Sequence, residues 1–361
     1  MKAPFPWFGG KRKIAPDVWA ALGDVDNFVE PFAGSLAVLL DRPVWHNGVT
    51  ETVNDADQYL ANFWRALSRA PDDVARYADH PVNEADLFAR HLWLVNTGAA
   101  QMREGMATDP DWFDAKIAGW WLWGVCSWIG SGWCSGRGPW TLGDAGQGVN
   151  RKLPHLGDAG QGVNRQLPHL GTAGLGVNRK LPHLGDAGQG VNRQLPHLGN
   201  AGQGDTLIPR NEALYEYMRQ LAARLRYVRV VCGDWQRVVT NGALSYGATV
   251  GVFLDPPYSD AADRDNNLYS VDSLDVAHDV RAWCIANGDN PRYRIVLAGY
   301  HDEHAHEMPS TWRMTAWKAN ASFKSSNGGG KNDFNRHKER LWLSPHCLRP
   351  TPQLFDMALG D

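Results

Sequence analysis

The chain has 361 residues, a formal net charge of −3 at pH 7 and five cysteines. This length is enough for two domains and a sizeable core. The charge excludes a globally basic nucleic-acid-binding protein, so any nucleic-acid partner has to meet a local basic patch. The cysteines are odd in number and scattered, which favours reduced thiols over a disulfide framework or a metal site.

Two features of the sequence bear on its location. No apolar signal core follows the first residues, and the most apolar stretch, residues 118–129, is too short to span a bilayer. We therefore expect a soluble, cytoplasmic protein that binds neither a metal nor a membrane.

The first motif lies in residues 4–14, a Gly-rich turn with Trp7 before it and Lys11 after it. Glycines in such a turn favour an irregular backbone. Taken alone, the stretch is as consistent with a basic surface loop as with a ligand-binding turn.

Residues 27–40 predict a strand, a tight turn and a helix. The turn carries Glu30, Phe32 and Gly34. A glycine lets the backbone approach a ligand closely, and a helix N-terminus offers free N–H groups. The spacing G-x-G-x-x-G is absent, which excludes a dinucleotide fingerprint. A plain strand–helix turn is the alternative.

A second strand is predicted to end at Asp55, and a helix over residues 58–68 follows it. An acidic residue that ends the second strand of a Rossmann-type sheet commonly binds ribose hydroxyls, so Asp55 is a candidate for that role. For Asp57 we prefer the role of helix N-cap.

The middle of the chain differs in composition. Residues 69–115 are polar and helical in pattern, and residues 117–129 are rich in tryptophan and predict a buried helix that packs against the first half. Residues 130–140 are Gly-rich and poor for a helix. They contain Arg137. For most of their residues we prefer core tryptophans and a structural loop, and a binding surface is the alternative.

Residues 142–205 repeat a fourteen-residue unit that starts at Leu142, Leu156, Leu170 and Leu184, with a partial copy from Leu198. Each unit has little apolar surface to bury, and the histidines lack metal-ligand spacing. The repeats carry six Lys/Arg against four Asp, with arginines recurring in register at Arg151, Arg165, Arg179 and Arg193. These arginines suggest a loop-like arm that lies along nucleic-acid phosphates. A duplicated surface loop without function is the alternative.

Regular structure returns near Asn211, which is expected to cap a helix with one apolar face. A strand over 228–232 then leads to Asp234 and Trp235. A helix cap is the alternative role for Asp234.

Another buried strand, residues 250–254, ends in Asp255, Pro256, Pro257 and Tyr258. Neither proline has an N–H, so the strand ladder stops and the turn is stiff. Asp255 and the carbonyl of Pro256 can both accept from one amine, while Tyr258 offers a flat face.

The last third predicts a polar loop after Tyr258, a helix over 272–287 and strands over 294–300 and 341–343. The Gly-rich run 325–331 lacks the ending and context of a phosphate loop, which excludes nucleotide hydrolysis. A basic cluster precedes the last strand and includes Arg336 and Lys338.

The ordered set of motifs resembles the Dam-type adenine-N6 DNA methyltransferases in their alpha arrangement, as found in phages and restriction–modification systems. The resemblance covers roughly residues 4–67 and 211–344 and not the repeats. It implies an α/β, Rossmann-like sheet that uses S-adenosylmethionine, formed by residues 1–67 and 206–361. Residues 68–205, including the repeats 142–205, form an inserted target-recognition region that is mostly helical and Gly-rich.

The resemblance also assigns roles. The catalytic residues are Asp255, Pro256, Pro257 and Tyr258. The residues that contact S-adenosylmethionine are Trp7, Lys11, Glu30, Phe32, Gly34, Asp55, Asp234, Trp235 and Asp255. The implied chemistry is direct methyl transfer to the amine of an adenine flipped out of the DNA. Ala298 is a small departure, because the family often has Ser there.

Double-stranded DNA is the implied partner, bound by a monomer. The candidate phosphate contacts are Arg137, Arg151, Arg165, Arg179, Arg193, Arg336 and Lys338. Three alternatives stay open: a cytosine-N4 methyltransferase, which usually has Ser in place of Asp255; a glutamine-directed protein methyltransferase, which usually has Asn; and a DNA-binding module that has lost activity.

Overall fold

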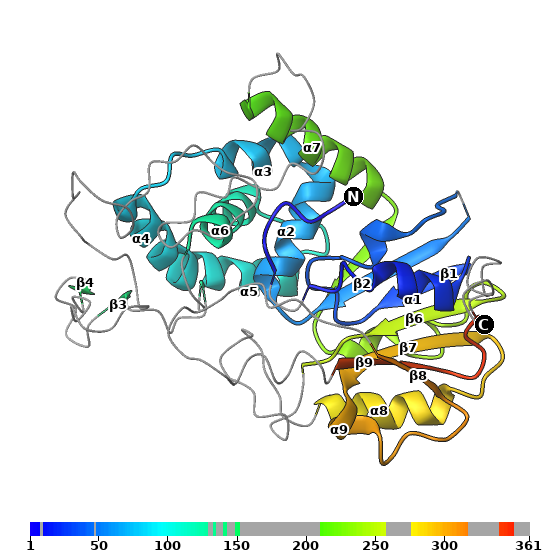
Figure 1. Ribbon diagram of the computed structural model, residues 1–361. Coiled ribbons are helices and arrows are strands. Elements are labelled where there is room, and N and C mark those ends of the chain that lie inside the picture. The colour runs from blue at the N-terminus through cyan, green and yellow to red at the C-terminus, as the bar shows by residue number, and fades with distance from the viewer. Residues whose placement is uncertain are drawn as a thin grey trace, which may run out of the picture.

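A computed structural model describes residues 1–7, 10–46, 48–128, 133–134, 140–142, 149–151, 210–257, 276–316 and 339–349 (Figure 1). Its centre is a seven-stranded sheet in the order β5-β2-β1-β6-β7-β9-β8. The strands are β1 (Asn27–Glu30), β2 (Thr50–Asp55), β5 (Val228–Cys232), β6 (Val250–Leu254), β7 (Tyr293–Tyr300), β8 (Arg313–Ala316) and β9 (Glu339–Leu343).

The first five of these strands in chain order are parallel, and β9 runs antiparallel to both of its neighbours. The chain builds β1, β2 and β5 toward one edge and then returns to place β6 beside β1. The strand order therefore reverses between β1 and β6. Open α/β sheets bind their ligands at such a reversal, outside the carboxyl ends of the strands. The mainly parallel sheet confirms the α/β class expected from the sequence.

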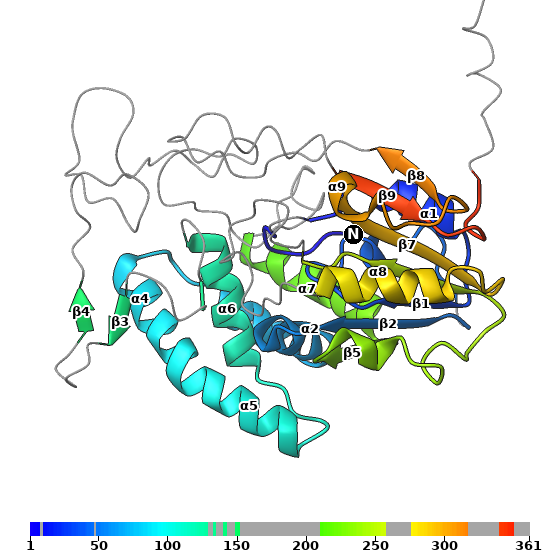
Figure 2. The same ribbon diagram turned by 90° about the horizontal axis from the view of Figure 1, so that it is seen from below.

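Apolar side chains of each strand alternate between the two faces, because successive residues of a strand point to opposite sides. Phe253 packs with α1 (Ala15–Leu22), α2 (Gln58–Arg69) and α7 (Arg210–Leu225), whereas Val252 and Leu254 pack with α8 (Val276–Asn287) and the short helix η4 (Trp235–Val238). Figure 2 shows the sheet with β8 at one edge and β5 at the other, and α8 in front of the strands.

Besides α7, the helices that follow α2 and precede β5 pack around α2 and α6. They are α3 (Pro71–Ala78), α4 (Glu84–Trp93), the π-helical turn η2 (Leu94–Gly98), α5 (Ala99–Thr108) and α6 (Ala115–Ser127). In α6, Trp121, Leu122 and Trp123 are buried, and the helix packs against α2 and α3. This confirms the buried tryptophan-rich helix predicted from the sequence. No described helix is long and apolar enough to cross a membrane.

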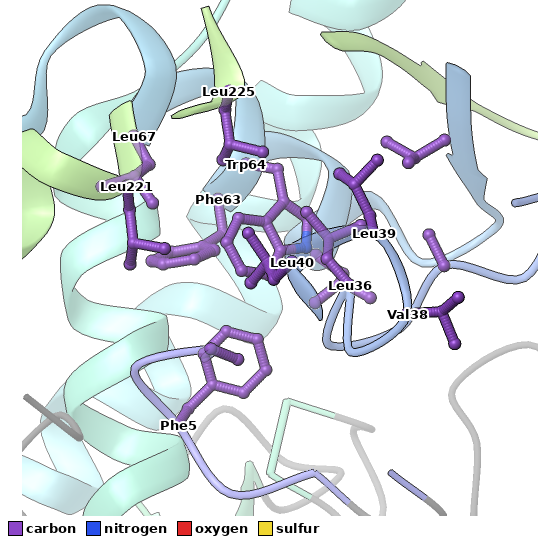
Figure 3. Close-up of a cluster of buried hydrophobic side chains, with 14 of the residues drawn as sticks. Phe5, Leu36, Val38, Leu39, Leu40, Phe63, Trp64, Leu67, Leu221 and Leu225 are labelled. Carbon is purple, nitrogen blue, oxygen red and sulfur yellow. The ribbon is translucent and has the colours of Figure 1, made fainter. Parts of the chain in front are cut away.

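One apolar cluster joins the N-terminal segment to the helices (Figure 3). Phe5 packs edge-on against Phe63 of α2 and Trp121 of α6, at ring-centroid distances of 5.4 and 5.1 Å respectively. Leu36, Leu39 and Leu40 from the segment after β1 lie in the same cluster. The cluster therefore fixes residues 3–7 and 36–40 against each other and against α2.

Two expectations about helices are wrong. Residues 35–40 form turns and a single 3₁₀ turn, η1 (Leu39–Asp41), instead of a helix. Gly34 and Leu36 have φ angles of +48° and +55°, in the left-handed region that an α-helix does not use. Asn211 does not cap α7, because that helix already begins at Arg210.

The repeats lie outside the described residues except for a two-stranded antiparallel pair, β3 (Trp140–Leu142) and β4 (Val149–Arg151). The expected loop after Tyr258, the Gly-rich run 325–331 and the start of the helix predicted over 272–287 lie outside them as well.

Candidate active site

Parallel strands end at the same edge of a sheet, and three acidic residues mark the ends of neighbouring strands here. Glu30 ends β1, Asp55 ends β2 and Asp255 directly follows β6. The charges of Asp55 and Asp255 both help to raise the pKa of the buried Glu30 carboxyl, although burial itself is the largest cause. The sequence therefore brings these carboxylates into one electrostatic neighbourhood, at the point where the strand order reverses.

The N-terminal motif reaches this edge through an ion pair. Lys11 Nζ lies 3.0 Å from Asp255 Oδ1, and the side chains of the two residues are 6% and 19% exposed. Burial raises the pKa of Asp255, and the Lys11 ammonium lowers it. The Lys11 carbonyl accepts from the N–H groups of Ile14 and Ala15, which places Lys11 immediately before α1. Residues 11 and 255, far apart in the sequence, thus share one buried site.

Gly34 is held from three sides. Its N–H donates to Asp55 Oδ2 at 2.9 Å, its carbonyl accepts from Trp64 Nε1 at 3.1 Å, and the indole of Trp7 lies against its Cα. A Cβ atom at this position would come within 2.7 Å of Trp7 Nε1. Because its φ angle is also positive, the position requires glycine.

Asp55 links three segments of backbone. Its Oδ1 accepts from the N–H of Asp57 at 2.9 Å, and its carbonyl accepts from the N–H of Gly233 at 3.1 Å. Burial and the charge of Asp57 raise the pKa of the Asp55 carboxyl to about 6, against the hydrogen bonds from backbone N–H groups, which lower it. The carboxylate is therefore mostly ionised at neutral pH and can accept further hydrogen bonds.

The sequence profile of the D12 class N6 adenine-specific DNA methyltransferases matches residues 7–93. The matched stretch contains Trp7, Lys11, Gly34 and Asp55, which form the geometry just described. This match supports an adenine-N6 DNA methyltransferase of the Dam type. Curated proteins gave no significant match to the chain.

The other predicted cofactor residues lie near the same edge of the sheet, and each makes different contacts. Glu30 is 2% exposed, and its Oε2 accepts from the N–H of Leu39 at 3.3 Å. Phe32 and Trp235 have ring centroids 6.1 Å apart. Asp234 accepts from the N–H of Gln236 at 2.8 Å and so caps η4, the role that the sequence had left as its alternative.

The predicted catalytic motif follows β6, the position expected from the sequence. Asp255, Pro256 and Pro257 come directly after Leu254, and Pro256 is buried. Tyr258 lies outside the described residues, as do Arg137, Arg165, Arg179, Arg193, Arg336 and Lys338. Arg151 ends β4, and its side chain likewise lies outside the described part of the chain.

Sequence reasoning missed the role of Asn54, which comes just before Asp55. Its side-chain amide donates to the carbonyls of Pro31 and Gly233, each at 3.0 Å. These two bonds tie the turn after β1 to the turn after β5. The amide side chain inside a predicted strand was the available signal, since a buried amide has to find hydrogen-bond partners.

Among the described residues, no group of three or more His, Cys, Asp or Glu side chains is arranged to hold a metal ion. The five cysteines are unpaired with one another.

Proposed function

We propose that Asp255 and the carbonyl of Pro256 hold the N6 amine of the target adenine in this methyltransferase. The observation that carries the proposal is the ion pair between Asp255 and Lys11. It joins the strand-end carboxylate to the segment that the family profile matches. The Lys11 ammonium already donates to Asp255 in the free protein, so Asp255 is an acceptor suited to an N–H donor.

The residues at the carboxyl edge fit S-adenosylmethionine, the methyl donor of this family. Asp55 and Asp255 are acceptors and anions, which suits a ligand that carries ribose hydroxyls, amines and a positive sulfonium. We assign Asp55 to the ribose hydroxyls, Trp7, Lys11 and Gly34 to the methionine end, and Phe32, Asp234 and Trp235 to the adenine ring. The side chain of Glu30 is buried, so we assign Glu30 to supporting the cofactor-binding turn after β1.

S-adenosylmethionine supplies a methyl group bonded to a cationic sulfur, which leaves as a neutral thioether. The protein has to make a poor nucleophile reactive, since the lone pair of the adenine amine is delocalised into the ring. Two acceptors that hold both amine hydrogens favour a pyramidal nitrogen with a localised lone pair. Fixing that nitrogen in line with the methyl group is a positioning effect. The amine must also lose one proton, and we assign Asp255, whose pKa burial raises, as the group that accepts it.

The target base lies inside the stack of double-stranded DNA, so it has to be flipped out to reach Asp255. We assign Tyr258 to stacking on the flipped base and Pro257 to keeping the turn rigid. Residues 68–205 are proposed as the target-recognition region, with Arg137 and the recurring arginines on DNA phosphates. Arg336 and Lys338 would contact phosphates from the catalytic half.

Product analysis tests this function. The protein is incubated with double-stranded DNA and labelled S-adenosylmethionine, and the DNA is digested to nucleosides that are identified by mass. We expect N6-methyladenine in the wild type and far less of it from Asp255→Asn in the same reaction time. N4-methylcytosine as the sole product would overturn the adenine assignment, and undiminished turnover by Asp255→Asn would show that the site is elsewhere.

A further inference from the structure

A third carboxylate lies close to the Lys11–Asp255 pair. Glu339 is the first residue of β9 and pairs across with Tyr300, the last residue of β7. Since β9 is antiparallel, its first residue lies at the same sheet edge where β6 and β7 end. The register continues across the sheet, with Leu254 beside Leu297 and Leu297 beside Trp342.

Strand alternation places Glu339 on the face that carries Lys11. Leu341 and Leu343, which share its parity on β9, pack in the cluster with α1, and so does Phe253, which shares the parity of Asp255 on β6. Lys11 lies immediately before α1 on that face. The charges agree with this placement. Burial raises the pKa of Glu339, the Lys11 ammonium lowers it and the Asp255 carboxylate raises it.

Glu339 is incompletely paired in this state. Its Oε2 is buried and accepts no hydrogen bond within the described part of the chain. A buried acceptor left without a partner costs free energy, because it has lost its water without replacement. The arrangement therefore favours a second state of the site in which a donor reaches Oε2.

The substrate requires such a second state. Lys11 Nζ occupies Asp255 Oδ1, an atom of the carboxylate assigned to the adenine amine. A buried ammonium displaced from its carboxylate needs another anion, because an unpaired charge in the interior is strongly unfavourable. Besides Asp255, Glu339 is a described carboxylate at this edge whose pKa the Lys11 ammonium lowers.

We infer that Glu339 is a positioning residue that receives the Lys11 ammonium when the target adenine takes its place on Asp255. This inference rests on the proposed role of Asp255 as the acceptor of the amine. One movement of the lysine side chain frees Asp255, supplies the missing donor to Oε2 and keeps the ammonium paired throughout. No covalent bond changes in this step.

The first test is Glu339→Gln, which keeps the shape of the side chain and removes its charge. Without the second anion, Lys11 stays on Asp255 and competes with the amine. We expect kcat on double-stranded DNA to fall about tenfold, equivalent to about 1.4 kcal/mol in the barrier, with little change in the Kd for S-adenosylmethionine. Glu339→Asp, which keeps the carboxylate, is expected to recover part of the loss.

A matched control is Glu307→Gln. Glu307 is exposed and pairs with Arg281 at 2.7 Å, on the opposite side of the sheet. The substitution changes the net charge by the same amount and should leave kcat unchanged. Thermal unfolding of each variant checks the fold. Glu339→Gln should fold at least as stably as the wild type, because it replaces a buried, incompletely paired carboxyl with a neutral amide.

The second test is a double-mutant cycle with Lys11→Met, read as single-turnover rates. If Glu339 acts through Lys11, then Glu339→Gln has no further effect once the ammonium is gone. Full additivity of the two changes would overturn the inference, and so would Glu339→Gln with wild-type kcat or a loss that Glu339→Asp does not reduce. The proposed function is judged separately, by whether the wild type makes N6-methyladenine at all.

Discussion

The indole of Trp7 lies so close to Gly34 that a Cβ atom on Gly34 would approach Trp7 Nε1 to 2.7 Å. The contact couples the N-terminal motif to the turn after β1. Gly34→Ala should break it, since an alanine at φ +48° is also strained by about 1–2 kcal/mol. We expect a lower melting temperature and an affinity for S-adenosylmethionine weakened by about tenfold or more, which corresponds to about 1.4 kcal/mol. Calorimetric titration and thermal unfolding measure both.

The matched control is Gly242→Ala, in the exposed segment after η4. A Cβ atom there would meet only Thr240 Oγ1 at 4.0 Å, and its φ angle is not positive. This variant should bind and unfold like the wild type. Equal behaviour of the two alanine variants would mean that the Trp7–Gly34 contact does not organise the site.

Asp255→Asn should separate binding from turnover. The asparagine keeps the shape of the turn but removes the anion that accepts from the amine and from Lys11. Losing one such charged acceptor is expected to lower kcat by about 10²–10³-fold, whereas the affinity for S-adenosylmethionine changes little. Single-turnover methylation and calorimetry report the two quantities. A large loss of cofactor affinity with intact kcat would assign Asp255 to the cofactor instead.

Much of this site could be predicted because its residues follow strands. Asp55 and Asp255 each come after a short apolar run, and the parallel topology brings such positions to one edge. Asp57 caps α2 as predicted, with its Oδ1 accepting from Tyr59 and Leu60. These are local rules of backbone geometry, and they hold without knowledge of the tertiary structure.

Other features depend on contacts between distant segments. The helix predicted after Gly34 does not form, because the turn takes left-handed angles at Gly34 and Leu36 while Trp7, Trp64 and Asp55 hold the glycine. The Lys11–Asp255 pair could not be derived from spacing either. Glu339 follows a basic cluster and was given no role from the sequence, and only the antiparallel placement of β9 brings it to the site.

The raised pKa of Asp55 gives the methyltransferase a pH dependence. The carboxyl titrates at about 6 in the folded protein, against 3.8 ordinarily. As the pH falls through about 6, Asp55 gains a proton and becomes a poorer acceptor for the ribose hydroxyls that we propose it binds. We therefore expect the Kd for S-adenosylmethionine to rise below about pH 6, and Asp55→Asn to bind weakly without that dependence. Calorimetric titrations from about pH 5 to 8 measure it.

Asp55 affects the stability of the folded protein in the opposite direction to the affinity for S-adenosylmethionine as the pH changes. Because the folded-state pKa is raised, the protonated form favours folding, and this contribution is lost as the pH rises through about 6. Chemical denaturation of the wild type and Asp55→Asn across this range reports the difference. The wild type is compared with Asp55→Asn at each pH. If the difference showed that Asp55 makes the affinity for S-adenosylmethionine and the stability both increase with rising pH, the assignment would be contradicted.

A buried ionic network joins β2 to α7, away from the catalytic edge. Glu51 is 2% exposed and accepts from Arg224 at 2.6 and 2.8 Å and from Arg42 at 3.2 Å. Glu51→Gln removes the carboxylate that pairs with the largely buried Arg224 and one of the two carboxylates beside Arg42, which keeps Asp24 at 3.2 Å. We expect a loss of about 3–5 kcal/mol in the free energy of unfolding. The control is Asp72→Asn, whose exposed partner Arg219 lies at 2.7 and 3.0 Å. That loss should be at most about 1 kcal/mol, and denaturant titration of both variants decides whether burial sets the difference.

The recurring arginines make a prediction about DNA affinity. Deleting residues 156–197 removes three whole fourteen-residue units, with Arg165, Arg179 and Arg193. If these arginines bind phosphates, the slope of log K against log salt becomes shallower by about 0.9 for each phosphate that is no longer neutralised. Replacing the three arginines with glutamine at constant length separates charge from length and should give the same shallower slope. Binding to a fluorescent duplex between low and high salt measures it, and slopes unchanged in both variants would mean that the repeats do not touch the DNA backbone.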